Sequence, residues 1–325
     1  MADTLINLVE YARGLEDAIP SLLIEQFATE SDVLQAIGFK TAKQGRNPFG
    51  REVELPGLAF RGINEDPEIS HGQREEFQDM CYPISGLLEI DRVITNRYGD
   101  GRQIQEMRGQ MKRGAAIWTD TFIDGDNATE PKEFSGLKAR LVADSGGNID
   151  GSTDDSRLLE NGGTSGGDAL SLSKMDLAAS LVNGLSHILV SRRMLVKFKA
   201  AARDSSLTNN QITDDFESDL GRRVTRFAGI PFLVGYPPSK NNIFLPFNEV
   251  ASGGGSAVTT SLYFVSFRED GVTGIHTQPP EIIDVGVTDR GVQNRDLFEW
   301  DTGISIEDFY AAMRLQSIKD AAIVA

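Results

Sequence analysis

The segment from Asp100 to Asp126 constrains the fold of this chain more than any other part of the sequence. Its apolar side chains recur every three or four residues, which places them on one face of a single long helix. These positions are Ile104, Met107, Met111, Ala115, Trp118 and Phe122. Polar and charged residues lie between them, and Gly125 followed by Asp126 is a helix stop signal. About 22 residues at ~1.5 Å each give a rod of roughly 33 Å.

A rod with one apolar seam must lie against other apolar surface. The β-rich segments on both sides of the predicted helix supply that surface, so we expect this helix to be the spine of the subunit. Within the seam, the predicted core residues are Met107, Met111, Trp118 and Phe122.

Length and composition indicate a soluble globular protein of about two domains. The 325 residues are 40% hydrophobic, enough for a large core. No run approaches the ~18 apolar residues of a membrane span, and the first residues lack the features of a signal peptide. Cys81 is the only cysteine, which excludes an internal disulfide and a cysteine metal cluster and suits a reducing cytoplasm. We interpret it as a buried thiol.

The charge is strongly acidic. The sequence has 32 Lys and Arg against 48 Asp and Glu, a formal net charge of −16. Such a balance opposes non-specific adhesion to phosphate backbones. By composition alone, the chain is not predicted to bind nucleic acid.

The first 44 residues predict short helices that are too small to fold alone. Apolar residues recur at helical spacing near Leu8 and again near Leu23, and Ser31 is placed to cap a third short helix. We expect an arm that docks on other surfaces, its own subunit's or a neighbour's.

Residues 45–80 change character and predict an extended β-excursion. Five Gly and three Pro separate two short runs, REVEL and LAFRGI, each with strand-like alternation. Arms of ~10 residues would each reach about 33 Å. A long ordered loop of this kind is usually functional, and here the expected function is contact with another chain.

The remaining segments alternate between predicted strands and helices. Strands are expected at 220–232, 230–234, 261–267 and 296–306, with a strand pair or a strand and turn at 81–93. A helix is expected from Ser173 to about Val190, opened by a capping box with Asp176. Residues 192–202 are expected to form a strand turning into a short helix, and 144–167 an exposed loop or hairpin.

Few residues are arranged for catalysis. Gly163–Gly167 matches G-x-S-x-G around Ser165, but a nucleophile elbow needs a buried strand before it and a helix immediately after it. The preceding residues predict no such strand, so a flexible loop is favoured. The three histidines, His71, His187 and His276, show no metal-ligand spacing, and His187 is expected on a core-side helix.

Metal and phosphate sites have no candidate either. The acidic runs 124–130 and 150–160 lack the sixth-position Gly and twelfth-position Glu of a calcium loop, and no phosphate-binding loop motif occurs. No catalytic residue, cofactor or metal is therefore predicted.

Six segments together resemble a known family. They are ESDVLQAIGF, LPGLAFRGINE, FIDGD followed by FSGLKAR, FAGIPFLV, SLYFVSFREDGVTGI and EWDTGISIEDFYAAMRLQSI. In order and approximate spacing they resemble the major capsid proteins of tailed bacteriophages, whose shell fold is called Hong Kong 97-like. The resemblance spans nearly the whole chain.

The resemblance implies an α+β architecture. It places an N-terminal arm at 1–44, an extended β-loop at 45–80, and a peripheral domain with the long spine helix at 81–133. An axial domain follows at 134–292, and a C-terminal strand segment at 293–325 returns to the peripheral domain. No scaffolding-like domain precedes the arm, so a separate scaffold protein or none is expected.

The implied function is structural. The subunits would assemble into hexamers and pentamers of an icosahedral phage head that encloses double-stranded DNA without sequence-specific binding. The expected location is the virion, after assembly in the host bacterial cytoplasm, with scaffold, portal and decoration proteins as candidate partners. Some relatives crosslink a loop lysine to a neighbour's asparagine; residues 45–80 contain no lysine, so this chemistry is not carried over.

Two other functions remain open. The first is the shell protein of a bacterial encapsulin-type compartment, which shares the fold and encloses a cargo enzyme. The second, more remote, is a serine hydrolase using Ser165.

The excursion also provides the candidate contact residues. Arg51, Phe60 and Arg61 lie on a segment that would be a long exposed edge in a monomer, which soluble proteins avoid. We expect Phe60 to insert into a neighbouring subunit and both arginines to pair with its carboxylates.

Overall fold

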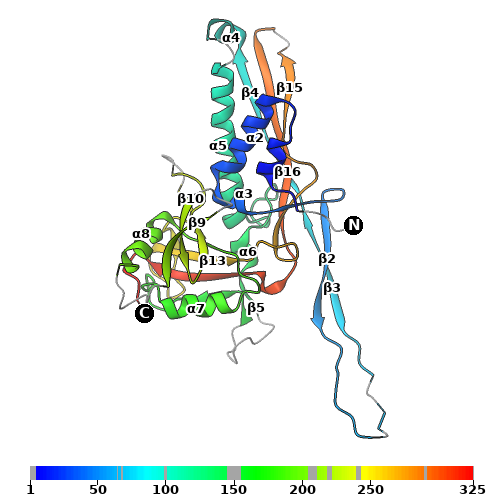
Figure 1. The fold of residues 1–325 in the computed structure, drawn as a ribbon, viewed down its shortest axis with the longest axis vertical. Coiled ribbons are helices and arrows are strands. Elements are labelled where there is room, and N and C mark those ends of the chain that lie inside the picture. Colours follow the sequence, from blue (N-terminus) through cyan, green and yellow to red (C-terminus); the bar gives the residue numbers. More distant parts are fainter. Residues whose placement is uncertain are drawn as a thin grey trace.

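The structure is a computed structural model that describes most of the chain. The described residues are 5–63, 65–66, 69–98, 101–144, 155–203, 211–217, 222–238, 243–288 and 291–324. Figure 1 shows an elongated upper part, a broader lower part, and a hairpin that projects away from both.

The upper part contains a five-stranded sheet. Its strands are β1 (Phe39–Thr41), β4 (Tyr82–Asp91), β14 (Val272–His276), β15 (Glu281–Val287) and β16 (Gln293–Ile306). The central strand is β16, which pairs antiparallel with β4 along one edge and with β14 and β15 along the other. Strand β1 adds to β14 in parallel, with Phe39 opposite Gly274. A Cβ atom at Gly274 would collide with the Phe39 ring, so the glycine makes room for this aromatic side chain.

Helix α5 (Gly101–Asp124) occupies nearly all of the stretch that periodicity predicted to be helical. The side chains of Met107, Met111, Trp118 and Phe122 are buried. The helix runs alongside the long strands of the sheet (Figure 1). Helix α2 (Ala18–Glu30) packs on it too, with the ring of Phe27 close to Gly114. An N-terminal helix therefore covers part of the seam, which the sequence analysis assigned to strands alone.

An aromatic cluster surrounds Trp118. Its ring lies 5.8 Å from the ring of Phe39, 6.1 Å from Phe134 and 6.1 Å from Trp300. The indole Nε1 donates to the Thr302 hydroxyl at 3.3 Å. This one residue therefore joins α5 to the first strand of the sheet and to the central one.

The lower part contains an eight-stranded sheet. Its strands are β7 (Leu158–Glu160), β8 (His187–Leu189), β9 (Ile212–Glu217), β10 (Arg222–Phe227), β11 (Ile230–Leu233), β12 (Glu249–Val250), β13 (Ala257–Val265) and β17 (Ala312–Lys319). They are ordered β7-β17-β13-β8-β11-β10-β9, with β12 on β13. Helices α7 (Leu172–Ser180) and α8 (Arg192–Ala201) contribute to a second core with this sheet. The smaller elements are α6 (Leu137–Arg140), the 3-10 helix η1 (Phe309–Ala311), and the strand pair β5 (Ala143–Asp144) and β6 (Asp155–Ser156).

The N-terminal helices dock on their own subunit. They are α1 (Leu8–Arg13), α2 and α3 (Asp32–Ala36), and Leu8, Leu23 and Phe27 are buried in the main core. Ser31 stands at the N-cap of α3, as predicted, but its side chain makes no capping hydrogen bond. Its hydroxyl instead accepts from the Thr119 hydroxyl of α5 at 2.8 Å, which ties the arm to the long helix.

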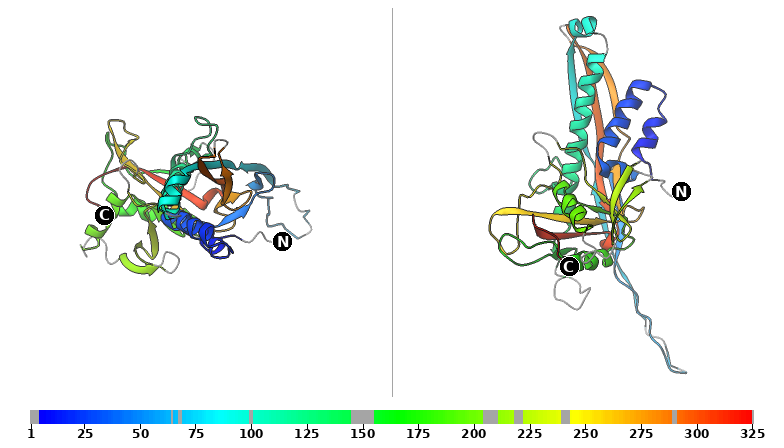
Figure 2. Two further views of the ribbon diagram at one scale, coloured as in Figure 1. Left: turned by 90° about the horizontal axis from the view of Figure 1, so that it is seen from above. Right: turned by 60° about the vertical axis from the view of Figure 1, so that its left-hand side comes forward.

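The excursion expected at 45–80 is an antiparallel hairpin. Strands β2 (Arg46–Glu54) and β3 (Gln73–Met80) pair from Arg46 opposite Met80 to Glu54 opposite Gln73. Figure 2 shows from two further directions that it leaves the body of the protein. The run LAFRGI was predicted as a strand and is not one. No described strand lies opposite it to complete a ladder.

The helix predicted from Ser173 to Val190 is wrong in its second half. It begins at Leu172, with Ser171 rather than Ser173 at the N-cap, and ends at Ser180. His187 to Leu189 form strand β8, which pairs with β11 and β13. Strand pairing thus overrode helical spacing, and His187 lies on a strand.

Two other local predictions need correction. Residues 192–201 are helical throughout, and the Ser191 hydroxyl caps α8 by accepting from the Met194 N–H at 3.2 Å. Residues 82–91 are one strand, which helix α4 (Arg92–Tyr98) follows. Of the exposed loop or hairpin expected at 144–167, residues 145–154 lie outside the described residues. Strands β5 and β6 on either side of them pair antiparallel, and β7 follows.

The two sheets divide the chain differently from the expected ranges. Strands β14 and β15 fall within 134–292 but pair into the sheet that holds β4 and β16. Strand β17 falls within 293–325 but pairs with β13 in the other sheet. Hydrogen-bonded pairing between distant strands sets these memberships.

None of the described helices combines the length and the apolar character that a membrane crossing requires.

Candidate assembly interface

Arg51 fastens the base of the hairpin to its own subunit. Its Nε donates to the Glu307 carbonyl at 2.9 Å, and a terminal nitrogen donates to the Ile306 carbonyl. Its guanidinium lies 4.9 Å from the centre of the Phe77 ring and 5.3 Å from that of Phe49. Burial lowers the pKa of Arg51 from its usual value. Arg51 therefore has partners within the subunit, and these contacts fix the direction in which the hairpin leaves.

A second set of contacts holds the same base. The Asn47 amide donates to the Ser305 hydroxyl at 3.0 Å. Arg140 forms an ion pair with Asp79 of β3 at 2.7 Å and donates to the Ile304 carbonyl at 3.3 Å. The sequence pattern gives no sign of these contacts, because β3 is exposed along almost its whole length and shows no apolar alternation.

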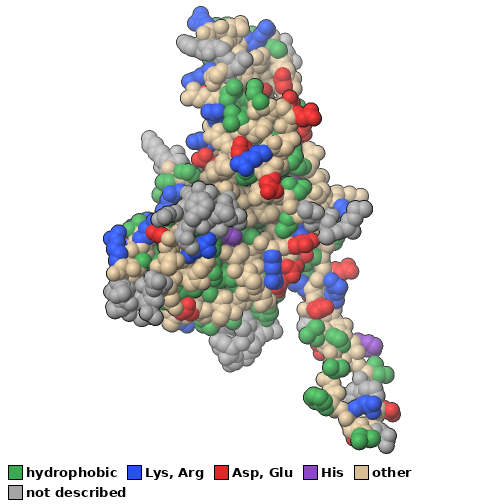
Figure 3. Space-filling model, viewed as in Figure 1, with side chains coloured by type: hydrophobic (Ala, Val, Ile, Leu, Met, Phe, Trp, Pro, Cys, Tyr) green, Lys and Arg blue, Asp and Glu red, His purple; other side chains and the backbone are tan. Residues whose placement is uncertain are grey.

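The hairpin tip, residues 55–72, exposes large apolar side chains. Leu58, Phe60, Ile63 and Ile69 are 88 to 109% exposed. Monomeric soluble proteins rarely leave such a group of apolar side chains uncovered. Figure 3 shows hydrophobic side chains along the thin projecting hairpin, with little other protein around it.

Polar contacts at the tip are local. An Arg61 Nη nitrogen donates to the Glu65 carbonyl at 2.8 Å, and the Gly62 N–H donates to the Glu65 carboxylate at 2.6 Å. The Arg61 side chain remains exposed. The structure thus places Phe60 and Arg61 side by side at the tip, whereas Arg51 lies at the base.

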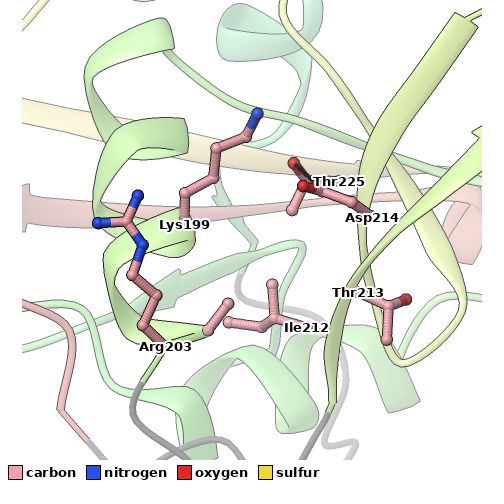
Figure 4. Close-up of a pocket in the computed structure, with 7 residues that line it drawn as sticks. Lys199, Arg203, Ile212, Thr213, Asp214 and Thr225 are labelled. Carbon is pink, nitrogen blue, oxygen red and sulfur yellow. Dashed lines mark hydrogen bonds between the residues drawn. The ribbon is translucent and has the colours of Figure 1, made fainter.

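Two hollows lined by described residues lie near polar side chains. One, of about 310 Å³, lies at the base of the hairpin and is lined by Arg51, Asp79 and Arg140 among others. The other, of about 220 Å³, lies between α8 and β9 beside Asp214, whose carboxylate accepts from the Thr225 hydroxyl at 2.6 Å (Figure 4). Neither lining contains Ser165, the serine considered as a hydrolase nucleophile.

Ser165 lies in an exposed turn. Its hydroxyl donates to the Gly254 carbonyl at 3.3 Å, and the next helix begins only at Leu172. The short strand β7 precedes it, but its residues are half-buried and four residues separate it from Ser165. Within the described ranges, no group of three His, Cys, Asp or Glu side chains is arranged to hold a metal ion.

The histidines and the cysteine are dispersed. His71 is exposed near the hairpin tip, His187 is half-buried beside the Ser186 hydroxyl at 2.9 Å, and His276 is fully buried. Cys81 is half-buried, and burial raises the pKa of its thiol to about 12. A thiol with such a pKa is a poor nucleophile near neutral pH.

An ion-pair network joins the two parts of the molecule. Lys138 of α6 lies 3.0 Å from Asp124 at the end of α5 and 3.0 Å from Glu249 of β12. Arg314 of β17 lies 3.0 Å from the other oxygen of Glu249. Burial alone would raise the pKa of Glu249, but Arg314, Ser261 and Lys138 outweigh it and hold that pKa below its usual value. The charged carboxylate thus connects α5 to the eight-stranded sheet.

Comparison with known proteins gives a result only at the level of structure. No family model matches the chain, and no curated protein matches its sequence. The capsid of a native GTA particle matches with a TM-score of 0.59 at 13% identity, over 90% of each chain. A Microbacterium phage, Oxtober96, matches with a TM-score of 0.60 at 10% identity, over 89% of this chain and 91% of that one. The chain has the Hong Kong 97-like shell fold.

The same shell fold also occurs outside phages. The holo-SrpI encapsulin complex of Synechococcus elongatus PCC 7942 matches with a TM-score of 0.59 at 12% identity, over 90% of this chain and 89% of that one. At identities of 10 to 13%, these matches concern the fold and do not transfer a function.

Proposed function

We propose that this protein is the major capsid protein of a tailed bacteriophage, which assembles into hexamers and pentamers of an icosahedral head around double-stranded DNA. The observation that carries the proposal is the apolar hairpin tip, 88 to 109% exposed, on a chain with a shell fold. A shell supplies the neighbour that covers it. Closed symmetry repeats the same contact around the particle.

The tip contact follows from this geometry. Phe60 inserts between apolar side chains of the neighbouring subunit, where a large aromatic residue contributes much of the binding energy. Arg61 beside it pairs with a carboxylate of that neighbour. Arg51, first expected to contact the neighbour, acts in this proposal from the base by orienting the hairpin.

The same proposal assigns a capsid role to each part of the chain. Residues 1–44 are the N-terminal arm and 45–80 the extended loop. The five-stranded sheet and α5 form the peripheral domain, and the eight-stranded sheet forms the axial domain around the hexamer and pentamer axes. Scaffold, portal and decoration proteins are the partners, and the virion, assembled in the host cytoplasm, is the location.

A second candidate is an encapsulin-type compartment that encloses a cargo enzyme. The observation in its favour is that the encapsulin match and the GTA capsid match have the same TM-score, 0.59. The contents of the particle separate the two functions. Genome-sized nucleic acid supports the capsid, and a co-purifying protein cargo without such nucleic acid supports the compartment.

The experiment is expression of the protein with the proteins encoded beside it, followed by sedimentation and electron microscopy. We expect closed shells of megadalton mass, whose nucleic acid and protein contents are then measured. A 35.5 kDa monomer that persists at high concentration in the presence of a cognate scaffold contradicts both candidates.

A further inference from the structure

A basic stripe follows the exposed side of α4 and α5. We define it as Arg92, Arg97, Arg102, Arg108, Lys112 and Arg113, all of them exposed. Between residues 92 and 119 the sequence has six Lys and Arg but two Asp and Glu, in a chain of net charge −16. Figure 3 shows Lys and Arg side chains gathered over α4 and α5, while Asp and Glu gather toward the side of β15. The overall acidity therefore does not describe this surface.

Four of the six stripe residues form no ion pair among the described residues. Arg102 pairs with Glu106 at 2.9 Å and Lys112 with Glu30 at 3.8 Å, and these side chains are about half exposed or more, except Glu30. Within the described part of the chain, Arg92, Arg97, Arg108 and Arg113 have no ion pair, although the charge of Arg113 acts on Asp120. Pairs at exposed positions contribute roughly 0 to 1 kcal/mol, so even the paired members can exchange partners at low cost.

The part of the stripe on α5 is rigid and presents no exposed apolar side chain between residues 101 and 113. The opposite side of α5 is fixed in the core through Met107, Met111 and Trp118, so the exposed side chains keep their spacing. Between residues 101 and 113 the exposed side chains are basic, Gln or Glu, apart from two glycines. Protein interfaces normally have an apolar centre, which this part of α5 lacks. Two exposed apolar side chains, Val93 and Ile94, lie at the α4 end of the stripe.

The spacing suits a linear polyanion. Arg102 and Arg113 are eleven residues apart, about 16 Å along the helix axis. Duplex DNA carries a negative charge for each ~1.7 Å of its axis, so a segment of that length presents about ten phosphates. At 0.1 M salt the Debye length is about 10 Å, so carboxylates farther away are largely screened.

We propose that the basic stripe binds the phosphate backbone of nucleic acid without reading its sequence, and that this side of α5 faces the interior of the shell. The inference deepens the proposed function and rests on it for the direction of the face. It also limits the expectation drawn from net charge, because a chain that repels polyanions as a whole can attract them at one rigid surface.

The test measures binding of the full-length protein to a fluorescent random-sequence 30-bp duplex by anisotropy, from 50 to 200 mM salt. The variant is Arg108→Gln with Arg113→Gln, which removes two cations without an ion pair. The matched control is Lys174→Gln with Lys319→Gln, which removes the same charge from exposed positions on α7 and β17. Shell assembly of each protein is followed separately by sedimentation without DNA.

We expect the stripe variant to bind about tenfold more weakly or worse at 0.1 M salt, with a logarithmic salt slope reduced by about 1.8. The control should match the wild type. Equal binding by both variants, or no binding by the wild type, overturns the proposal. Loss of shells with unchanged DNA binding also overturns it, since the stripe would then meet an acidic protein surface. A wild type that forms no shells, while the stripe variant alone loses DNA binding, refutes the proposed function and supports phosphate binding.

Discussion

At the scale of single residues, Trp118 connects more of the fold than any neighbour on its helix. Its ring meets Phe39 from the first strand and Trp300 from the central strand of the sheet. We predict that Trp118→Ala lowers the free energy of unfolding by ~3–5 kcal/mol, because it leaves a large cavity among these rings. Chemical denaturation of the purified protein measures this change.

The adjacent Ile117 provides the control for Trp118. Its side chain is 38% exposed, so Ile117→Ala removes apolar atoms from the same turn without opening a buried cavity. We expect Ile117→Ala to change stability far less than Trp118→Ala. If the two variants denature alike, the apolar seam of α5 is not a core face.

His276 makes the fold sensitive to acid. It is fully buried, its ring stacks on Phe39 at 5.6 Å, and neither ring nitrogen has a hydrogen-bond partner within the described residues. Burial lowers its pKa from 6.5 to about 4. Below pH 6.5 the unfolded chain therefore binds a proton that the folded chain does not bind until about pH 4. Stability falls across that window.

The contribution of His276 to the pH dependence of stability can be measured by comparing a variant with the wild type. Each pH unit in the window corresponds to about 1.4 kcal/mol, so roughly 3 kcal/mol should be lost between pH 6.5 and 4. We predict that His276→Phe flattens the unfolding free energy across that window, whatever its effect at pH 7. His71→Phe, at an exposed position, should keep the wild-type slope. If the unfolding free energy of His276→Phe falls with pH as steeply as that of the wild type, His276 takes up its proton in the folded protein and does not cause the loss of stability.

At the scale of elements, the hairpin separates folding from assembly. Its base is bonded to the end of β16 and the residues after it, whereas its tip has no described contact with the body. Glu54 and Gln73 lie opposite each other, so an Asn-Gly turn can join them in place of residues 55–72. We predict that this shortened protein keeps its circular dichroism and thermal stability but forms no closed shells.

A smaller change tests the same tip without altering chain length. Phe60→Ser should reduce shell yield in sedimentation, because the aromatic ring no longer inserts into a neighbour. Val196→Ser, at a 65% exposed position on α8, is the matched loss of an exposed apolar side chain and should assemble normally. Normal shells from the shortened protein would show that assembly does not need the tip. Global unfolding of the shortened protein would show that the tip belongs to the core of its own subunit.

At the scale of the whole molecule, charge controls how subunits meet. A subunit of net charge −16 repels its copies, and a cation at the contact offsets part of that repulsion. We predict that Arg61→Ala slows assembly at low salt, followed by light scattering, and that the difference from wild type shrinks as salt rises. Lys174→Ala removes an equal charge from α7 and should assemble like the wild type. If Arg61→Ala slows assembly equally at every salt concentration, the cause is lost packing and not lost charge.

Local pattern alone determined several features. The apolar spacing at 104–122 specified α5 almost to its ends, because a periodicity of three and four over six positions fits a helix and not a strand. The runs at 230–234 and 261–267 specified β11 and most of β13, because both are strongly apolar and end at turn residues. The Gly and Pro content of 45–80 indicated an excursion, and Phe60 and Arg61 were recognisable as exposed for the same reason.

The tertiary structure decided what pairs with what. Strand β1 lies beside β14 although more than two hundred residues separate them, and β17 leaves the sheet of β16 to join β13. His187 to Leu189 followed helical spacing in sequence and became a strand because β11 and β13 offered pairing partners. The sequence pattern gave Arg51 no partner within the subunit, whereas in the fold it donates to the carbonyls of Ile306 and Glu307. Periodicity reports only which way a side chain faces along its own segment, whereas partners are set by contacts between segments far apart in the chain.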